Sequence, residues 1–139
     1  MSEATLTETA VRAEAPAQTS PAPTPCCMPG CRVAVPAPLA AERLCLMHFT
    51  DAVEQACARM RREAVAGPAS EEYREKTASY ITEYGVMLAQ VATSDLLLPD
   101  PMKRRVLSTL LTLMILRESL SRCASRVVCI SSGSRPPAA

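Results

Sequence analysis

Cysteine and the single histidine of this chain gather in one short segment, and their spacing constrains the fold more than any other feature. The chain has 139 residues, with seven Cys and one His. Cys26 and Cys31 enclose a Pro-Gly dipeptide, which is typical of a turn that brings two side chains together. Cys45 and His48 are three residues apart, so they share one face if they lie on a helix. The two pairs provide a closed Cys3His set, which zinc binds tetrahedrally in structural sites.

Two alternatives to this ligand set stay open at the level of sequence. Cys is doubled at positions 26 and 27, so Cys27 can replace Cys26 as the first ligand. The thiols can also be small core side chains, a common role of free Cys, although this Ala- and Pro-rich segment offers little other core. Three further cysteines lie outside the segment. We expect Cys57 and Cys123 to be buried beside apolar stripes and Cys129 to be exposed near a helix end.

The N-terminal sequence favours a cytoplasmic location. Glu3 and Glu8 stand where a signal peptide has basic residues, and no apolar run follows them. The longest nearly unbroken apolar run, over about 106–116, is shorter than the ~20 residues of a membrane-spanning helix. We therefore expect a soluble chain in which Cys residues serve as thiols or metal ligands rather than as disulfides.

The Cys and His segment resembles the short zinc fingers of bacterial and phage proteins, which read Cys-x4-Cys and then Leu-Cys-x2-His-aromatic. The matching residues here are Gly30 before Cys31, Arg32 after it, and the run Leu44-Cys45-Leu46-Met47-His48-Phe49. The resemblance covers residues 26–49 only, and we call this segment the knuckle. It implies a structural Zn²⁺ in a small treble-clef-like unit, and it implies no single function. The ligands that it implies are Cys26, Cys31, Cys45 and His48.

Apolar periodicity after the knuckle predicts an all-α fold with about three helices. The chain has four Gly, too few for the turns of a many-stranded sheet protein. We expect the first helix over about 38–66, ending at the Gly-Pro pair 67–68, with Thr50 or Asp51 as an alternative start. Its predicted core face has 3-4 spacing and consists of Leu46, Phe49, Val53, Ala56 and Met60.

The second and third helices have clear start signals. Ser70 is the expected N-cap of the second helix, and Pro99 is expected to stop it. Gly85 lies inside this helix, where it would let another backbone approach. Asp100 is the expected N-cap of the third helix, with Pro101 at its first helical position. The predicted stripe of the second helix is Tyr73, Thr77, Tyr80, Ile81, Tyr84, Met87, Leu88 and Val91, and that of the third is Met102, Val106, Thr109, Leu113, Leu116, Leu120, Cys123 and Val127.

The middle of the third helix is apolar almost all round, which indicates that it is covered on most sides. Two partner helices in one small chain hardly suffice, so we expect self-association into a larger bundle. The expected organisation is a disordered tail over 1–25, rich in Ala, Thr and Pro, then the knuckle over 26–49, a helical body over 50–130 and a second disordered tail over 131–139.

These features favour a non-catalytic interaction or regulatory protein with a structural zinc site and a helical, oligomeric body. The only His is assigned to the metal, no Gly-rich phosphate loop is present, and Asp occurs three times, so we do not expect an enzyme. Homo-oligomerisation or a protein partner is the expected form of interaction.

The main alternative is a nucleic-acid-binding, transcription-related protein that uses the knuckle and the basic residues Lys103, Arg104 and Arg105. The net charge of +1, the apolar Leu46-Met47 pair between two ligands and the few aromatic residues speak against it. The same basic residues can instead be solvated, pair with acidic groups on the second helix, or contact an acidic partner. Peripheral membrane association through the third helix is a further alternative, although its apolar sector is wide for a helix that lies flat in an interface.

Overall fold

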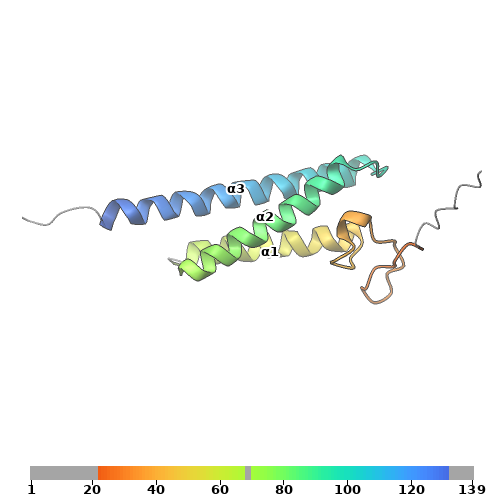
Figure 1. Cartoon of the computed structure of the whole chain (residues 1–139), viewed down its shortest axis with the longest axis horizontal. Coiled ribbons are helices and arrows are strands. Elements are labelled where there is room, and N and C mark those ends of the chain that lie inside the picture. The colour runs from red at the N-terminus through yellow and green to blue at the C-terminus, as the bar shows by residue number, and fades with distance from the viewer. Residues whose placement is uncertain (1–21, 68–69, 132–139) are drawn as a thin grey trace, which may run out of the picture.

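The computed structural model describes residues 22–67 and 70–131, with side chains as far as residue 122, and this part of the chain is all-α (Figure 1). A 3-10 helix, Ala37–Leu39, precedes three long helices, α1 (Leu46–Ala66), α2 (Glu71–Thr93) and α3 (Asp100–Ser131). Successive long helices run in opposite directions, and α3 packs against both α1 and α2. The predicted all-α fold is confirmed. Most of the tails predicted over 1–25 and 131–139, and the side chains of Cys123 and Cys129, lie outside the described residues. Residues 22–25 are described, and the Thr24 carbonyl accepts a hydrogen bond from the Val35 N–H at 2.8 Å. Ser131 is the last residue of α3.

Helix α1 begins at Leu46, so both predicted starts, about residue 38 and Thr50 or Asp51, are wrong. The segment before it forms only the 3-10 turn, and Arg43 then adopts a left-handed conformation with φ of 55°, which an α-helix cannot contain. Cys45 is the N-cap, and its carbonyl accepts the first helical hydrogen bond from the Phe49 N–H at 2.9 Å. The helix ends at Ala66, where the sequence predicted.

The ends of α2 and α3 follow local capping signals. Ser70 is the N-cap of α2, as predicted, because its hydroxyl accepts a hydrogen bond from the Tyr73 N–H at 3.2 Å. The helix ends at Thr93, well before Pro99, because the Ser94 N–H and hydroxyl both bond to the Val91 carbonyl. Helix α3 begins at Asp100, one residue earlier than predicted.

The core lies between the predicted faces of the three helices. Every residue of the predicted α1 stripe is buried. On α2 the centre of the buried face is shifted to Ile81 and Leu88, while Tyr80 and Tyr84 are half-buried and stack on each other with ring centroids 4.1 Å apart. The 3-10 helix adds Leu39, which is fully buried. The knuckle thus contributes to the same core as the helical body.

One face of α3 is left uncovered in the single chain. Leu107, Leu111, Met114 and Ile115 are between 48% and 61% exposed, although the opposite face of the helix is buried. Gly85 of α2 lies next to Leu110 of α3. A Cβ at Gly85 would lie 3.9 Å from the Leu110 side chain and near no foreign backbone, so the predicted backbone approach at this glycine is wrong.

Candidate metal centre

A tight turn positions the first two thiols. The Cys31 N–H donates to the Met28 carbonyl at 3.0 Å, which closes a four-residue turn with Pro29 and Gly30 at its centre. Gly30 has φ of 78°, as a type II turn requires at its third position, and Pro at the second position fits the same turn. The Cys26 N–H donates to the Val33 carbonyl at 2.9 Å, which makes the segment double back on itself.

A second hydrogen bond decides which of the doubled cysteines faces inward. The Cys27 N–H donates to the Arg43 carbonyl at 2.8 Å, and Arg43 presents that carbonyl from its left-handed conformation. Cys26 is 6% exposed and its thiol belongs to the cluster described below, whereas Cys27 is exposed and its thiol does not. The sequence left the choice between Cys26 and Cys27 open because it does not show that the Arg43 carbonyl accepts a hydrogen bond from the Cys27 amide.

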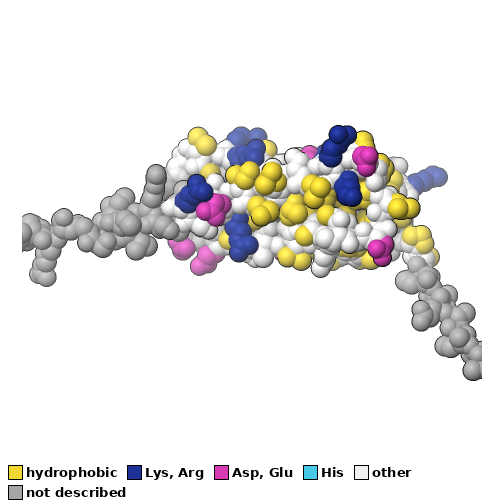
Figure 2. Space-filling view, turned by 90° about the horizontal axis from the view of Figure 1, so that it is seen from above, with side chains coloured by type: hydrophobic (Ala, Val, Ile, Leu, Met, Phe, Trp, Pro, Cys, Tyr) yellow, Lys and Arg dark blue, Asp and Glu magenta, His cyan; other side chains and the backbone are white. Residues whose placement is uncertain are grey.

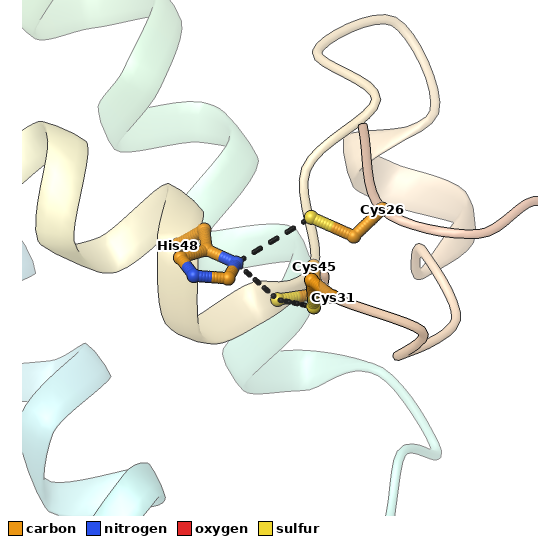
Figure 3. Close-up of side chains that lie close together, drawn as sticks. All are labelled: Cys26, Cys31, Cys45 and His48. Carbon is orange, nitrogen blue, oxygen red and sulfur yellow. Dashed lines mark hydrogen bonds between the residues drawn. The ribbon is translucent and has the colours of Figure 1, made fainter. Parts of the chain in front are cut away.

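The start of α1 positions the other two side chains. Cys45 is the N-cap of this helix and His48 lies in its first turn, and both side chains point toward those of Cys26 and Cys31 (Figure 3). Cys45 is 1% exposed, and His48 is half-buried. Cys45 and His48 therefore lie on the same side of α1, as predicted, but at its N-terminus rather than within it. As the N-cap, Cys45 has a non-helical backbone conformation.

The four predicted ligand residues come together in space. The His48 Nδ1 atom lies 3.3 Å from the Cys45 Sγ and 3.5 Å from the Cys26 Sγ, and the Cys31 and Cys45 sulfurs are 3.9 Å apart (Figure 3). All four potential ligand atoms lie within 4.8 Å of one another. The chain therefore contains a Cys3His group that is placed to bind one metal ion.

Three of the six separations between ligand atoms are close to those of a tetrahedral zinc site. Bonds of about 2.3 Å to sulfur and about 2.0–2.1 Å to nitrogen place two sulfurs about 3.8 Å apart and a sulfur and a nitrogen about 3.6 Å apart. The observed 3.9 Å between sulfurs, and 3.3 and 3.5 Å between sulfur and nitrogen, need only small adjustments to reach these values. The donor set of three soft sulfurs and one imidazole also suits zinc among the common metal ions.

The electrostatics of the cluster favour a cation. Burial opposes ionisation of Cys26, but hydrogen bonds from the backbone of Cys45 and Met28 and from the His48 side chain outweigh it and lower the pKa of Cys26 to about 6. Burial, together with the neighbouring thiols of Cys26 and Cys31, raises the pKa of Cys45. One thiolate therefore forms easily while the next is opposed, because like charges at short range disfavour each other. A divalent cation removes this opposition.

Contacts beyond the cluster attach the knuckle to the helical body. The 3-10 helix packs against α2. The Tyr84 hydroxyl donates to the Glu42 carboxylate at 3.3 Å, and the Phe49 and Tyr84 rings stack with centroids 5.6 Å apart. Leu39 and Glu42 carry no sequence signal for these contacts, because both contacts are made with the distant helix α2.

The three basic residues at the start of α3 do not act as one group. Arg105 bonds to Glu54 at 2.6 and 3.0 Å and also pairs with Asp51, while Lys103 and Arg104 are exposed. The Thr109 hydroxyl donates to the same Glu54 carboxylate at 3.0 Å. The acidic partners of Arg105 therefore lie on α1, and the prediction of partners on the second helix is wrong. Asp51, predicted as an alternative start of the first helix, is instead one of the two acidic partners of Arg105.

Comparisons with known proteins return no match: no protein-family model, curated protein or solved structure is similar to this chain. Among the described residues, no helix combines the length and the hydropathy that crossing a membrane requires. Cys57 is 3% exposed, as predicted, and its burial raises the pKa of its thiol. The molecule is thus defined by its all-α fold and its Cys3His cluster.

Proposed function

We propose that this chain is a non-catalytic zinc-binding interaction protein, in which a structural Zn²⁺ keeps the knuckle folded against a helical body that binds another polypeptide. The observation that carries the proposal is the set of four potential ligand atoms, from Cys26, Cys31, Cys45 and His48, that lie within 4.8 Å of one another. Four protein ligands fill a tetrahedral zinc, so no position is left for a reactive water. The role of the metal is then to stabilise structure.

The place of the cluster supports a structural role. It joins the turn at Gly30 to the first turn of α1, two segments connected by a loop with little regular structure. Metal binding in such a unit supplies folding free energy that its small core cannot. The uncovered apolar face of α3 supports the second half of the proposal, because contiguous exposed apolar surface marks interaction sites.

Nucleic-acid binding is the weaker candidate. Its predicted surface was the basic stretch at residues 103–105, and the guanidinium of Arg105 is already neutralised by Asp51 and Glu54. The stretch at 103–105 then offers only two exposed cations, Lys103 and Arg104, which are few for a phosphate-binding surface. A salt-dependent mobility shift with generic DNA or RNA at low ionic strength would favour this candidate.

Metal analysis of the purified full-length chain tests the proposed function. We expect one zinc per chain in the wild-type protein and in Cys27→Ala, whose exposed thiol lies outside the cluster. Cys31→Ala and His48→Ala each remove one of four ligands, so we expect their zinc content to fall to a small fraction of one. Undiminished zinc in both ligand variants would overturn the proposal, as would a wild-type chain that takes up no zinc when supplied with it.

A further inference from the structure

The uncovered face of α3 has an ordered pattern of charge and apolar side chains. Its centre is formed by Leu107, Leu111, Met114 and Ile115, all exposed. At the helical repeat, Asp100 and Arg104 continue this face toward the N-terminus, and Glu118 and Arg122 continue it toward the C-terminus. All four charged residues are exposed, and Arg122 pairs with Glu118 along the helix at 3.3 Å. Figure 2 shows the side of the molecule on which α3 lies, where hydrophobic side chains gather between charged side chains toward both ends.

Acidic and basic residues of this face stand at equal distances on either side of Leu111. Asp100 and Arg122 are equally far from Leu111 along the helix, and so are Arg104 and Glu118. Each of these two pairs joins one acid to one base. Leu107 and Ile115 obey the same relation, because they are equally distant from Leu111, whereas Met114 is matched by Ser108. An antiparallel copy of this face, placed with Leu111 opposite Leu111, therefore meets it with opposite charges facing at both ends.

We propose that a second copy of this chain covers the face, with the two α3 helices antiparallel and a two-fold axis passing at Leu111. Leu107 then faces Ile115 of the other copy, and Arg104 faces Glu118. The same charges disfavour an in-register parallel arrangement, since it would set Arg104 against Arg104 and Glu118 against Glu118. The segment from Arg104 to Glu118 is about 21 Å long at 1.5 Å per residue. Antiparallel helices that cross at about 20° stay in contact over such a length.

The neighbouring surface of α2 extends the contact. Val86 is 52% exposed and lies with Met114 along a shallow groove between α2 and α3. Leu110 and Gly85 line the same groove. An approaching helix therefore meets an apolar surface wider than one helix face, which is the geometry of a bundle completed by two chains. The inference rests on the proposed function only in treating the helical body as a binding module, and it does not involve the zinc.

Sedimentation velocity of the full-length chain tests the dimer. We expect a dimer for the wild-type protein and a monomer for Leu111→Arg, because the two-fold axis sets the two introduced cations against each other. The dissociation constant should rise at least about 100-fold, as for the loss of a central contact. Val65→Arg is the matched control, since Val65 is 88% exposed on α1, away from this face. It should stay dimeric, and circular dichroism checks that both variants are folded.

A charge exchange tests the register. Arg104→Glu and Glu118→Arg should each weaken the dimer about 3-fold to 10-fold, because each sets like charges face to face. The combined variant restores opposite charges and should return to within about 2-fold of the wild-type value. The proposal is overturned by a wild-type monomer at about 100 µM, by a dimer that survives Leu111→Arg, or by a combined variant as weak as the single ones. Zinc content measured on the same samples separates a failure of the dimer from a failure of the metal site.

Discussion

The three long helices are stabilised differently from residues 26–45, the part of the knuckle that precedes α1. Before α1, the buried residues are Cys26, Leu39 and Cys45, and two of these belong to the Cys3His cluster. In the helices the buried residues are mostly aliphatic and form one continuous core. Apolar burial stabilises the helices, whereas the knuckle has too few apolar side chains for this to suffice. A ligand cluster can take the place of a core in a segment of this size.

We expect metal removal to unfold the knuckle and to leave the three long helices folded. On chelation, the backbone amides of Cys26, Cys27 and Val35 should lose protection by about 100-fold or more, because their hydrogen bonds depend on the folded knuckle. Amides in the middle of α1 and α3 should keep theirs. Hydrogen exchange read by mass spectrometry measures both regions in one experiment. Equal loss of protection in the helices would show that the body depends on the metal as much as the knuckle does.

Substitution of Leu39 tests how strongly the knuckle is attached to the helical body. Its side chain is fully buried in the common core, so Leu39→Ala should cost about 2–5 kcal/mol in urea unfolding of the zinc-bound chain. After chelation the knuckle no longer holds Leu39 in place, and the cost should fall markedly. Leu88→Ala, equally buried but on α2, is the control, and its cost should be the same with and without metal. If both variants respond alike to chelation, the two regions are not separately stabilised.

The N-cap of α2 should report on the helical body alone. Ser70→Ala removes the acceptor of the Tyr73 N–H, which should lower the free energy of unfolding by about 1 kcal/mol. Zinc content should stay at the wild-type value, because Ser70 lies far along the chain from the cluster. Ser70→Asp, which also caps helices well, should recover most of the loss. A drop in zinc content would contradict the independence of the two regions.

The smallest effect is expected from the ion pair between α1 and α3. The Arg105 guanidinium holds the pKa of Glu54 below its ordinary 4.5. The stabilisation by the Glu54–Arg105 ion pair is therefore present above about pH 4.5 and is lost as the pH falls through the lowered pKa of Glu54. Because the side chains of Arg105 and Glu54 are 34% and 41% exposed, we expect less than about 1 kcal/mol.

Urea unfolding between neutral and acid pH measures this contribution. Glu54→Gln should flatten the acid side of the profile, and Arg105→Gln should flatten it to the same extent, since either change removes the pair. The combined variant should show no further change. Effects that simply add would mean that the two residues act separately.

Local sequence signals predicted the helical elements well and their junctions poorly. The stripe on α1 and the cap at Ser70 depend on spacing of three or four residues, which the sequence displays directly. The start of α1 at Leu46 depends on the left-handed Arg43, a residue type with no preference for that conformation. The early end of α2 depends on Ser94, whose hydroxyl satisfies the Val91 carbonyl and makes Pro99 unnecessary as a stop.

The candidate site divides in the same way. The sequence alone determined that two close pairs, Cys26 or Cys27 with Cys31 and Cys45 with His48, are spaced as metal ligands, because pair spacing is a local property. Only the tertiary structure decided between Cys26 and Cys27, since that choice depends on a hydrogen bond from the Cys27 amide to the distant Arg43 carbonyl. It also decided that the uncovered side of α3 is the one centred on Leu111. A helix that is apolar almost all round does not indicate which side its own chain will cover, and that is set by the long-range packing of α1 and α2.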